Sequence, residues 1–127
     1  MNANLCPCGL GEPFANCCAP LHADKRRTAT AEQLMRSRYS AFAVGDTAYL
    51  LKTWHPSTRP AELDLDPEQS WTRLDILDHT GGGPFDSEGT VHFRAHYQLH
   101  GQAGSLTENS RFRRTDKTWF YIDGDHD

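Results

Sequence analysis

Four cysteines near the N-terminal end are the residues whose type and spacing point most directly to chemistry. Cys6 and Cys8 flank one proline, and eight residues separate Cys8 from the adjacent pair Cys17 and Cys18. Thiolate sulfur is a preferred ligand of zinc, and a structural zinc site takes four ligands in a tetrahedron. We therefore predict that these four cysteines hold a structural zinc ion.

The segment that carries the cysteines cannot build a core of its own. Residues 6–21 are rich in Cys, Gly and Pro and show neither helical nor strand periodicity, so a metal must hold them together. Adjacent side chains converge only at a turn or a helix start, which we expect at Cys17 and Cys18. His22, four residues further on, is an alternative fourth ligand. Four protein ligands leave no open position, so we do not expect a catalytic zinc ion.

Three other side chains could carry protons, although none belongs to a recognised catalytic motif. His55 stands at an expected helix end, where imidazole can transfer protons or simply cap the following proline turn. Glu108 and Asp123 lie among aromatic residues, where a carboxyl group can act as a base. Structural ion pairs are the alternative, and one of them would fix the first long helix on the sheet. The candidate cationic partners are Arg36, Arg38 and Arg111. We assign no catalytic residue and keep these three as candidates.

Two helices are predicted before the midpoint of the chain. Thr30 and Gln33 have the spacing of a capping box, and Gly45 is a natural stop. The apolar stripe of this helix comprises Leu34, Met35, Tyr39 and Phe42. Asp46 then caps a second, shorter helix that ends at His55-Pro56.

From Trp71 onward the periodicity changes to two, which predicts strands. We expect strands at 71–79, 89–100, 105–114 and 118–123, with turns at 101–104 and 116–117. By alternation, Trp119, Tyr121 and Asp123 share a face. Helices followed by antiparallel strands predict an α+β fold in which helices pack on one curved sheet, often leaving a pocket.

Three histidines mark a polar face on the second predicted strand. His92, His96 and His100 recur at spacings of four, which on a strand separates neighbours by roughly 13 Å, too far to share a metal ion. This face could also support a homodimer.

Composition and charge narrow the class of protein. The formal net charge of −4 argues against a general nucleic-acid binder. No apolar run reaches membrane-spanning length, and Met1 to Leu5 show no signal peptide. We therefore expect a cytoplasmic protein, in which clustered cysteines favour metal binding over disulfides. The predicted organisation is a zinc module at 1–22, a linker at 23–29 and an α+β domain at 30–127.

The N-terminal residues resemble the SEC-C motif, a zinc module named for the C-terminal end of the SecA translocation ATPase. The resemblance rests on Cys-Pro-Cys-Gly at 6–9, Gly11, Phe14 and Cys-Cys at 17–18. It implies that the four cysteines are the ligands, that Phe14 packs beside them and that the module docks a protein partner. Leu10 stands where serine is common in that motif.

The remaining residues resemble the YchJ-type family of uncharacterised bacterial proteins. The motifs are LMRSRYSAF at 34–42, TWHP at 53–56, SRF at 110–112 and WFYIDG at 119–124. That family joins a SEC-C module to a domain similar to nuclear transport factor 2, in which helices close a curved sheet into a cone. The resemblance implies this fold but no reaction.

Three functions compete on this basis. The first, which the sequence favours, is a non-enzymatic adaptor whose zinc module docks a protein partner, with the basic run at 25–27 beside it. The second is small-molecule binding or catalysis in the cone pocket. The third is thiol redox sensing, in which oxidation of the cysteines releases zinc.

Overall fold

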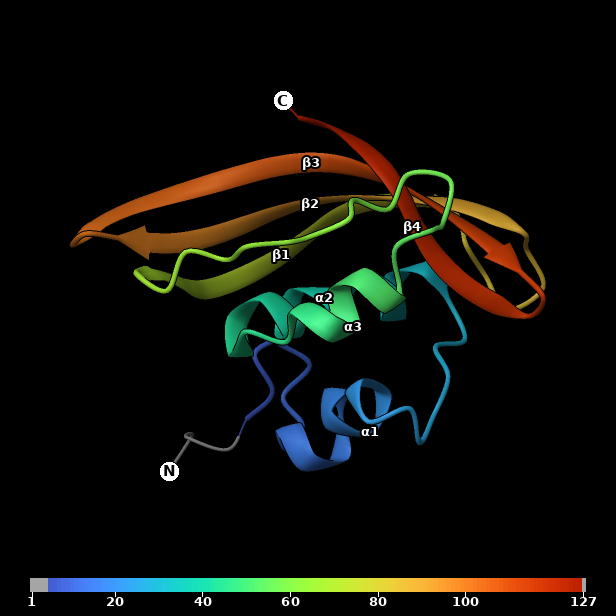
Figure 1. The fold of residues 1–127 in the computed structure, drawn as a ribbon, viewed down its shortest axis with the longest axis horizontal. Helices are drawn as coiled ribbons and strands as arrows, with labels where there is room; N and C mark the ends of the chain where they lie inside the picture. The colour runs from blue at the N-terminus through green and yellow to red at the C-terminus, as the bar shows by residue number, and fades with distance from the viewer. Residues whose placement is uncertain (1–4, 127) are drawn as a thin grey trace.

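A four-stranded antiparallel sheet and the helices on one of its faces make up most of the protein, as a computed structural model of residues 5–126 shows (Figure 1). The helical elements are the 3₁₀ turn η1 (Phe14–Asn16) and the helices α1 (Cys18–His22), α2 (Ala31–Val44) and α3 (Thr47–Lys52). The strands are β1 (Gln69–Gly81), β2 (Glu88–Leu99), β3 (Gln102–Thr115) and β4 (Thr118–His126). The predicted α+β class is confirmed. Residues 1–4, where no signal peptide was expected, lie outside the described residues, as does Asp127.

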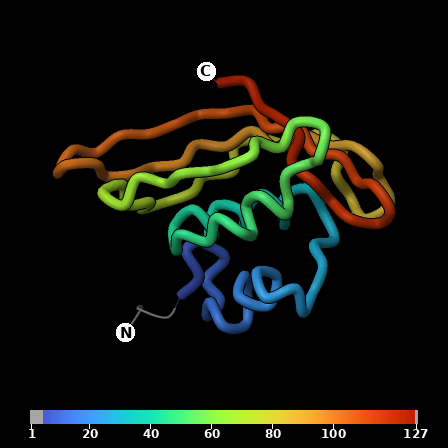
Figure 2. The backbone as a smooth tube through the Cα atoms, viewed as in Figure 1, coloured from blue at the N-terminus to red at the C-terminus, as the bar shows by residue number. Residues whose placement is uncertain are grey.

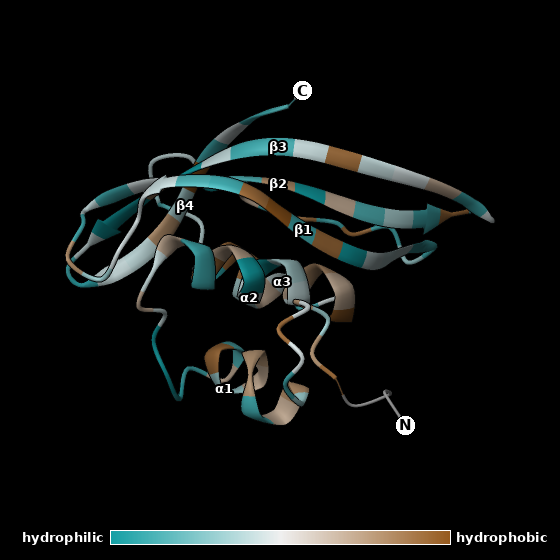
Figure 3. Ribbon diagram, turned by 180° about the vertical axis from the view of Figure 1, so that it is seen from behind, coloured by the Kyte–Doolittle hydropathy of each residue, from teal (hydrophilic) through white to brown (hydrophobic). Residues whose placement is uncertain are grey.

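The elements stack in three layers. The curved sheet forms the first layer, α2 and α3 form the second, and the N-terminal segment with α1 lies on the far side of these helices (Figures 1 and 2). Figure 3 shows the same stacking from behind, with apolar and polar stretches following one another along the strands. The strands occur in the order β1-β2-β3-β4, each antiparallel to the next. Among the described helices, none has the length and apolar character that a membrane crossing requires.

Helix α2 begins and ends where the sequence predicted. The hydroxyl of Thr30 accepts a hydrogen bond from the N–H of Gln33 at 3.0 Å, and the Gln33 amide oxygen accepts from the N–H of Ala29 at 2.7 Å. These bonds satisfy two backbone N–H groups at the helix start. Gly45 ends the helix with φ at 80°, in the left-handed region. Asp46 then caps α3 as predicted, because its carboxylate accepts from the third residue of that helix at 3.0 Å.

The period of two in β2 determines which side chains enter the core. Val91, Phe93 and Ala95 are buried against α2, whereas His96 lies on the opposite, polar face and bonds to Asp75 at 2.9 Å. The main core consists of Ala31, Leu34, Met35, Tyr39, Leu74, Val91, Phe93, Ala95, Phe112 and Trp119. Three of the four residues predicted for the apolar stripe of the helix belong to it. The fourth, Phe42, packs against a neighbouring cluster.

Strands β1, β3 and β4 are longer than predicted, and β3 begins earlier because the β2–β3 turn is tighter. The β2–β3 turn consists of His100 and Gly101, with φ at 52° and 79°, rather than residues 101–104. The β3–β4 turn consists of Asp116 and Lys117, as predicted, with φ at 51° and 66°. Two-residue turns with both φ values positive match the right-handed twist of the flanking strands.

A bulge in β4 changes which residues face the helices. Arg111 pairs with Asp123 but the next residue, Phe112, pairs with Tyr121, so Ile122 is inserted between them. The alternation therefore breaks, and Asp123 lies on the exposed face beside Arg111. The prediction that Asp123 shares a face with Trp119 and Tyr121 is wrong for this reason.

The start of α2 is held against the β1–β2 connection. The N–H of Ala31 donates to the carbonyl of Gly82 at 2.9 Å. A Cβ atom at Gly89 would lie 2.5 Å from the Cα of Gly82, so the two backbones meet closely there. This approach requires a residue without a side chain at position 89.

We predict that Gly89→Ala lowers the free energy of unfolding by about 1–3 kcal/mol, because the added methyl group must push two backbones apart. Urea denaturation followed by tryptophan fluorescence checks this value. Gly83→Ala is the matched control, because its Cβ would meet only the side chain of Asp86, at 3.2 Å. Equal stability of the two variants would contradict the proposed close packing.

Candidate functional site

The four cysteines lie together at the centre of the N-terminal segment. Their sulfur atoms all lie within 4.8 Å of one another, and all four residues are buried. The Sγ of Cys17 is 3.6 Å from that of Cys8 and 4.0 Å from that of Cys18. A tetrahedron with metal–sulfur distances of about 2.3 Å has sulfur–sulfur edges of about 3.8 Å. The cluster therefore has the composition and the dimensions of a site that could hold one metal ion.

The backbone turns sharply in both halves of this cluster. The N–H of Gly9 donates to the carbonyl of Cys6 at 3.3 Å, and Gly9 has φ at 87°, a conformation that glycine adopts without strain. In the second half, Cys17 follows η1 directly and precedes α1. The adjacent Cys17 and Cys18 thus converge at a helix start, as the sequence predicted. Phe14 packs against the cluster, also as expected.

His22 is not brought into the cluster. Its Nε2 is 2.8 Å from the carbonyl of Ser37, and its ring packs against Phe14 and Tyr49 with centroid distances of 5.7 and 4.5 Å. His22 therefore connects α1 to α2. The structure supplies the fourth sulfur from Cys18, and the alternative in which His22 replaces it does not agree with this geometry.

The thiols cannot all ionise unless a cation is present. The hydrogen bond with Cys18 lowers the pKa of Cys8 to about 5, although burial opposes this shift. The same hydrogen bond, together with burial, raises the pKa of Cys18, and burial raises the pKa of Cys17 to about 12. One negative charge is thus shared among neighbouring thiols, and further ionisation needs a positive charge at their centre.

Two arginines place positive charge beside the cluster. Arg36 donates to the carbonyl of Cys8 at 2.7 Å and also pairs with Glu32 at 3.0 Å, one helical turn away. Arg26 donates to the carbonyl of Cys17 at 3.4 Å. Four thiolates around a divalent ion carry a charge of about −2, which these guanidinium groups would partly offset. The sequence offered Glu108 or Asp123 as the ion-pair partner, but Arg36 pairs with Glu32 of its own helix, and its contact with the module was not foreseen.

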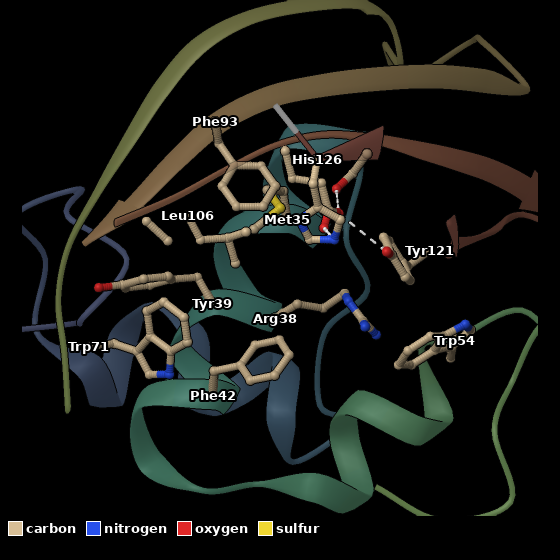
Figure 4. A pocket seen from close by; sticks show the side chains of 13 residues that line it. Met35, Arg38, Tyr39, Phe42, Trp54, Trp71, Phe93, Leu106, Tyr121 and His126 are labelled. Carbon is tan, nitrogen blue, oxygen red and sulfur yellow. Dashed lines mark hydrogen bonds and ion pairs between the residues drawn. The ribbon is translucent and has the colours of Figure 1, made fainter. Parts of the chain in front are cut away.

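The opposite face of α2 lines a cavity of about 300 Å³ between this helix and the sheet (Figure 4). Its walls are mostly aromatic and aliphatic, and a few polar groups reach it from both sides. The lining residues are Met35, Arg38, Tyr39, Phe42, Trp54, Trp71, Phe93, Ala95, Leu106, Glu108, Ser110, Tyr121 and His126. The pocket expected from the fold class is therefore present.

Arg38 carries a buried charge on the helix side of this cavity. Only 4% of its surface is exposed. Its Nη1 donates to the carbonyl of Leu50 at 2.8 Å and to the hydroxyl of Thr53 at 2.7 Å. Its guanidinium carbon lies 5.3 Å from the ring centroid of Trp54 and 4.5 Å from that of Tyr121 (Figure 4). Burial lowers the pKa of Arg38 to about 10, so the side chain remains protonated at pH 7.

The predicted ion pair between the helix and the sheet is not formed. No carboxylate of residues 5–126 lies within 4.0 Å of the Arg38 guanidinium nitrogens. Asp123 faces away because of the bulge in β4, and Glu108 is bound by other donors. The Nε and Nη2 atoms of Arg38 make no hydrogen bond to the part of the chain that the structure describes.

Glu108 faces the cavity from β3 and is 7% exposed. Its carboxylate accepts hydrogen bonds from the hydroxyl of Ser110 and, at 3.2 Å, from the hydroxyl of Tyr121. Its Oε1 is 3.2 Å from Nε2 of His126 (Figure 4). A side chain at Gly124 would clash with this carboxylate. The sequence identified Glu108 as a candidate but not Ser110 or His126. Ser110 could have been identified, because residues 108 and 110 alternate along β3 and therefore share a face.

The other two catalytic candidates lie outside the cavity. Asp123 pairs with Arg111 at 2.5 Å, which is the structural alternative that the sequence offered. The Nδ1 of His55 accepts from the backbone N–H of Ser57 at 3.1 Å and lies 2.7 Å from the Ser57 hydroxyl, so the imidazole caps the turn. Of the three candidates, Glu108 is the one that reaches the cavity.

We predict that the protein binds one equivalent of a divalent metal ion. Loss of a residue that only supports a metal ligand typically weakens binding roughly 10–100-fold, and Cys8→Ser, which removes a ligand itself, should weaken it more than this. His22→Ala should change the affinity by less than about tenfold, since His22 contacts α2 instead of the sulfurs. Titration with cobalt(II), followed by its thiolate absorption bands, measures both. A larger loss from His22→Ala than from Cys8→Ser would contradict the assigned ligand set.

Comparison with known sequences agrees with this arrangement. Residues 30–124 match the family described as "YchJ, middle NTF2-like domain", and residues 4–20 match the SEC-C motif. A UPF0225 protein of Streptomyces coelicolor is 54% identical over 120 residues, which cover 94% of each chain. A UPF0225 protein of Corynebacterium glutamicum is 53% identical over 123 residues, covering 96% of this chain and 97% of the relative.

Two solved structures are similar along nearly the whole chain. The solution structure of a SEC-C motif containing protein from Rhodopseudomonas palustris has a TM-score of 0.82 at 35% identity, covering 94% of this chain and 96% of that one. The crystal structure of a SEC-C motif containing protein from Psychrobacter arcticus has a TM-score of 0.77 at 27% identity, covering 97% and 84%. The chain therefore belongs to the YchJ-like UPF0225 family, which combines a SEC-C motif with an NTF2-like domain.

Proposed function

We propose that the protein binds a small organic molecule in the cavity between α2 and the sheet, and that its four cysteines hold a structural zinc ion. The observation that carries the first part is the burial of Arg38 at the cavity wall without an anionic hydrogen-bond partner, since the charge of Glu108 acts on it only from beyond 4.0 Å. Burying a charge in this way lowers stability unless another interaction compensates for it. Charged groups in such environments are concentrated at binding and catalytic sites.

The cysteine cluster supports a structural zinc ion. Four sulfurs that all lie within 4.8 Å of one another suit a single central ion, and a four-thiolate shell leaves no position for a substrate. The core of this segment consists of the cysteines and Phe14, so the metal would replace a hydrophobic core. Burial of all four residues gives oxidants little access, so this geometry does not favour redox sensing.

We predict that a screen of small organic molecules by thermal shift finds ligands that raise the melting temperature, because a molecule selective for the folded state stabilises it. Leu106→Trp should abolish these shifts, since the larger side chain fills the cavity that Leu106 lines. Leu77→Trp is the matched control, because Leu77 is 43% exposed and does not line the cavity. Ligands that bind Leu106→Trp as well as the wild type would contradict a site in this cavity.

A second candidate is docking of a protein partner by the metal module. Leu10 is 54% exposed and lies between Gly9 and Gly11, both in the left-handed conformation. An exposed leucine on a loop fixed by metal binding offers an apolar anchor, and anchors of this kind contribute much of the energy of an interface. Lys25 and Arg27, exposed in the segment that follows α1, would favour an acidic partner surface.

We predict that Leu10→Glu removes a protein partner that in-cell cross-linking recovers with the wild-type chain, because a charge replaces the apolar anchor. Leu77→Glu, an identical change on the exposed side of β1, should retain it. Unchanged metal content of Leu10→Glu would show that the module is intact. Recovery of the same partner at the same yield with both variants would exclude Leu10 as the anchor.

A further inference from the structure

We infer that the ligand of the cavity is a small organic acid whose carboxylate binds Arg38, whose hydroxyl or amine donates to Glu108 and whose apolar body packs among the aromatic walls. This inference rests on the proposed binding function and specifies its ligand class. Three independent features of the cavity support it: the unused donors on the helix side, the acceptor on the sheet side and the volume between them.

The helix side of the cavity gives Arg38 no anionic hydrogen-bond acceptor. The two hydrogen bonds of Arg38 both involve Nη1 and go to neutral oxygens of Leu50 and Thr53, which do not cancel the charge. The planar guanidinium group has five N–H donors, and two of them can bind both oxygens of one carboxylate. Such paired, charge-assisted bonds are stronger than bonds between neutral groups. A ligand carboxylate would therefore supply the missing negative charge.

Trp54 forms the wall of the cavity beside Arg38. Its ring lines the cavity beside Arg38, and its indole nitrogen is buried without a hydrogen-bond partner among the residues that the structure describes. Figure 4 shows this nitrogen on the side of the ring away from Arg38, so Trp54 offers the ligand its ring and not its N–H group. The donors of Arg38 alone therefore favour an acceptor-rich, anionic group over a cationic one.

The sheet side of the cavity has the opposite character. Glu108 accepts bonds from Ser110 and Tyr121 and lies beside His126. A carboxylate has about four acceptor positions, so these three neighbours leave room for one more donor. A hydroxyl or amine on the ligand would fill it. Because Glu108 is bound by several donors and Arg38 by neutral acceptors, the ligand carboxylate is expected at Arg38.

The size and the walls of the cavity limit the remainder of the ligand. About 300 Å³ is near the lower end for small-molecule sites, which suits a single ring and short side chain better than a nucleotide. Phe42, Trp71 and Phe93 line this space and offer ring faces and edges for packing (Figure 4). An aromatic hydroxy acid is the simplest molecule that meets all three requirements.

Three related probes test this inference by calorimetric titration: 3-phenyllactate, its neutral amide, and 3-phenylpropionate, which lacks the hydroxyl group. We expect the wild-type protein to bind 3-phenyllactate at least tenfold more tightly than the amide. Arg38→Met should remove this preference for the acid. Glu108→Gln should reduce the preference for 3-phenyllactate over 3-phenylpropionate while keeping the preference for acid over amide.

The variants also distinguish loss of binding from loss of folding. Arg38→Met removes a buried charge but also removes the donor to the oxygens of Leu50 and Thr53, so the two effects oppose each other and its melting temperature should change by only a few degrees. Arg73→Met is the matched control, since Arg73 lies on β1 with an exposed side chain that pairs with Asp75 outside the cavity. It should bind all three probes as the wild type does.

Two outcomes would overturn the inference. Equal binding of the acid and the amide, or an unchanged preference for the acid in Arg38→Met, would show that Arg38 does not bind the ligand. In that case, binding in the cavity would still stand if Leu106→Trp blocked it. Absence of binding by all three probes would exclude aromatic hydroxy acids as the ligand class. The broader screen with Leu106→Trp would then decide the proposed function separately.

Discussion

Packing on both faces of α2 is the constraint on which the rest of the structure depends. One face presents Arg36, Ser37 and Ser40 to the cysteine segment, and the other presents Met35, Arg38 and Tyr39 to the cavity and the sheet. The helix start is held by the carbonyl of a glycine in the β1–β2 connection, and its end is set by a left-handed glycine. Movement of this helix would therefore alter the cysteine cluster and the cavity together.

The surface of α2 toward the module combines buried hydroxyl groups with a small apolar contact. Ser37 and Ser40 are both fully buried at this contact, and they bond to Tyr49 and to the sulfur of Cys6. Small hydroxyl groups permit close approach, but they contribute little apolar area. Leu21 of α1 adds an apolar contact with Ala41, Tyr49 and Leu50, and the sulfur cluster holds the two halves of the module to each other.

Local signals in the sequence predicted the elements well. The caps at Thr30 and Asp46, the stop at Gly45 and the cysteine cluster all depend on residues close together in the chain. Apart from the bounds of the β2–β3 turn, the errors concern features that depend on distant residues. The bulge at Ile122 has no distinct sequence signature, yet it moves every later residue of β4 to the opposite face.

The polar contacts across the layers were likewise beyond sequence reasoning. Arg36 binds a carbonyl 28 residues away, and His22 binds a carbonyl of α2 instead of a metal. The contact of His126 with Glu108 requires the register of β3 and β4, which was unknown from the sequence. Glu108 was singled out as a carboxylate among aromatic residues, whereas the burial of Arg38 without an anionic hydrogen-bond partner depends on three separate elements.

The contrast between the arginines is the strongest argument for function. Arg36 and Arg111 pair with carboxylates at 3.0 and 2.5 Å, and each connects parts of the fold. Arg38 is more deeply buried than either, but the chain gives it only neutral acceptors and aromatic rings. For stability alone, an apolar side chain at this position would serve as well or better. The fold accommodates this charge at a cost, beside an open cavity. The carboxylate of Glu108, on the opposite side of the cavity, is bound by its own donors. A ligand that supplies an anion to Arg38 and a donor to Glu108 best explains this arrangement.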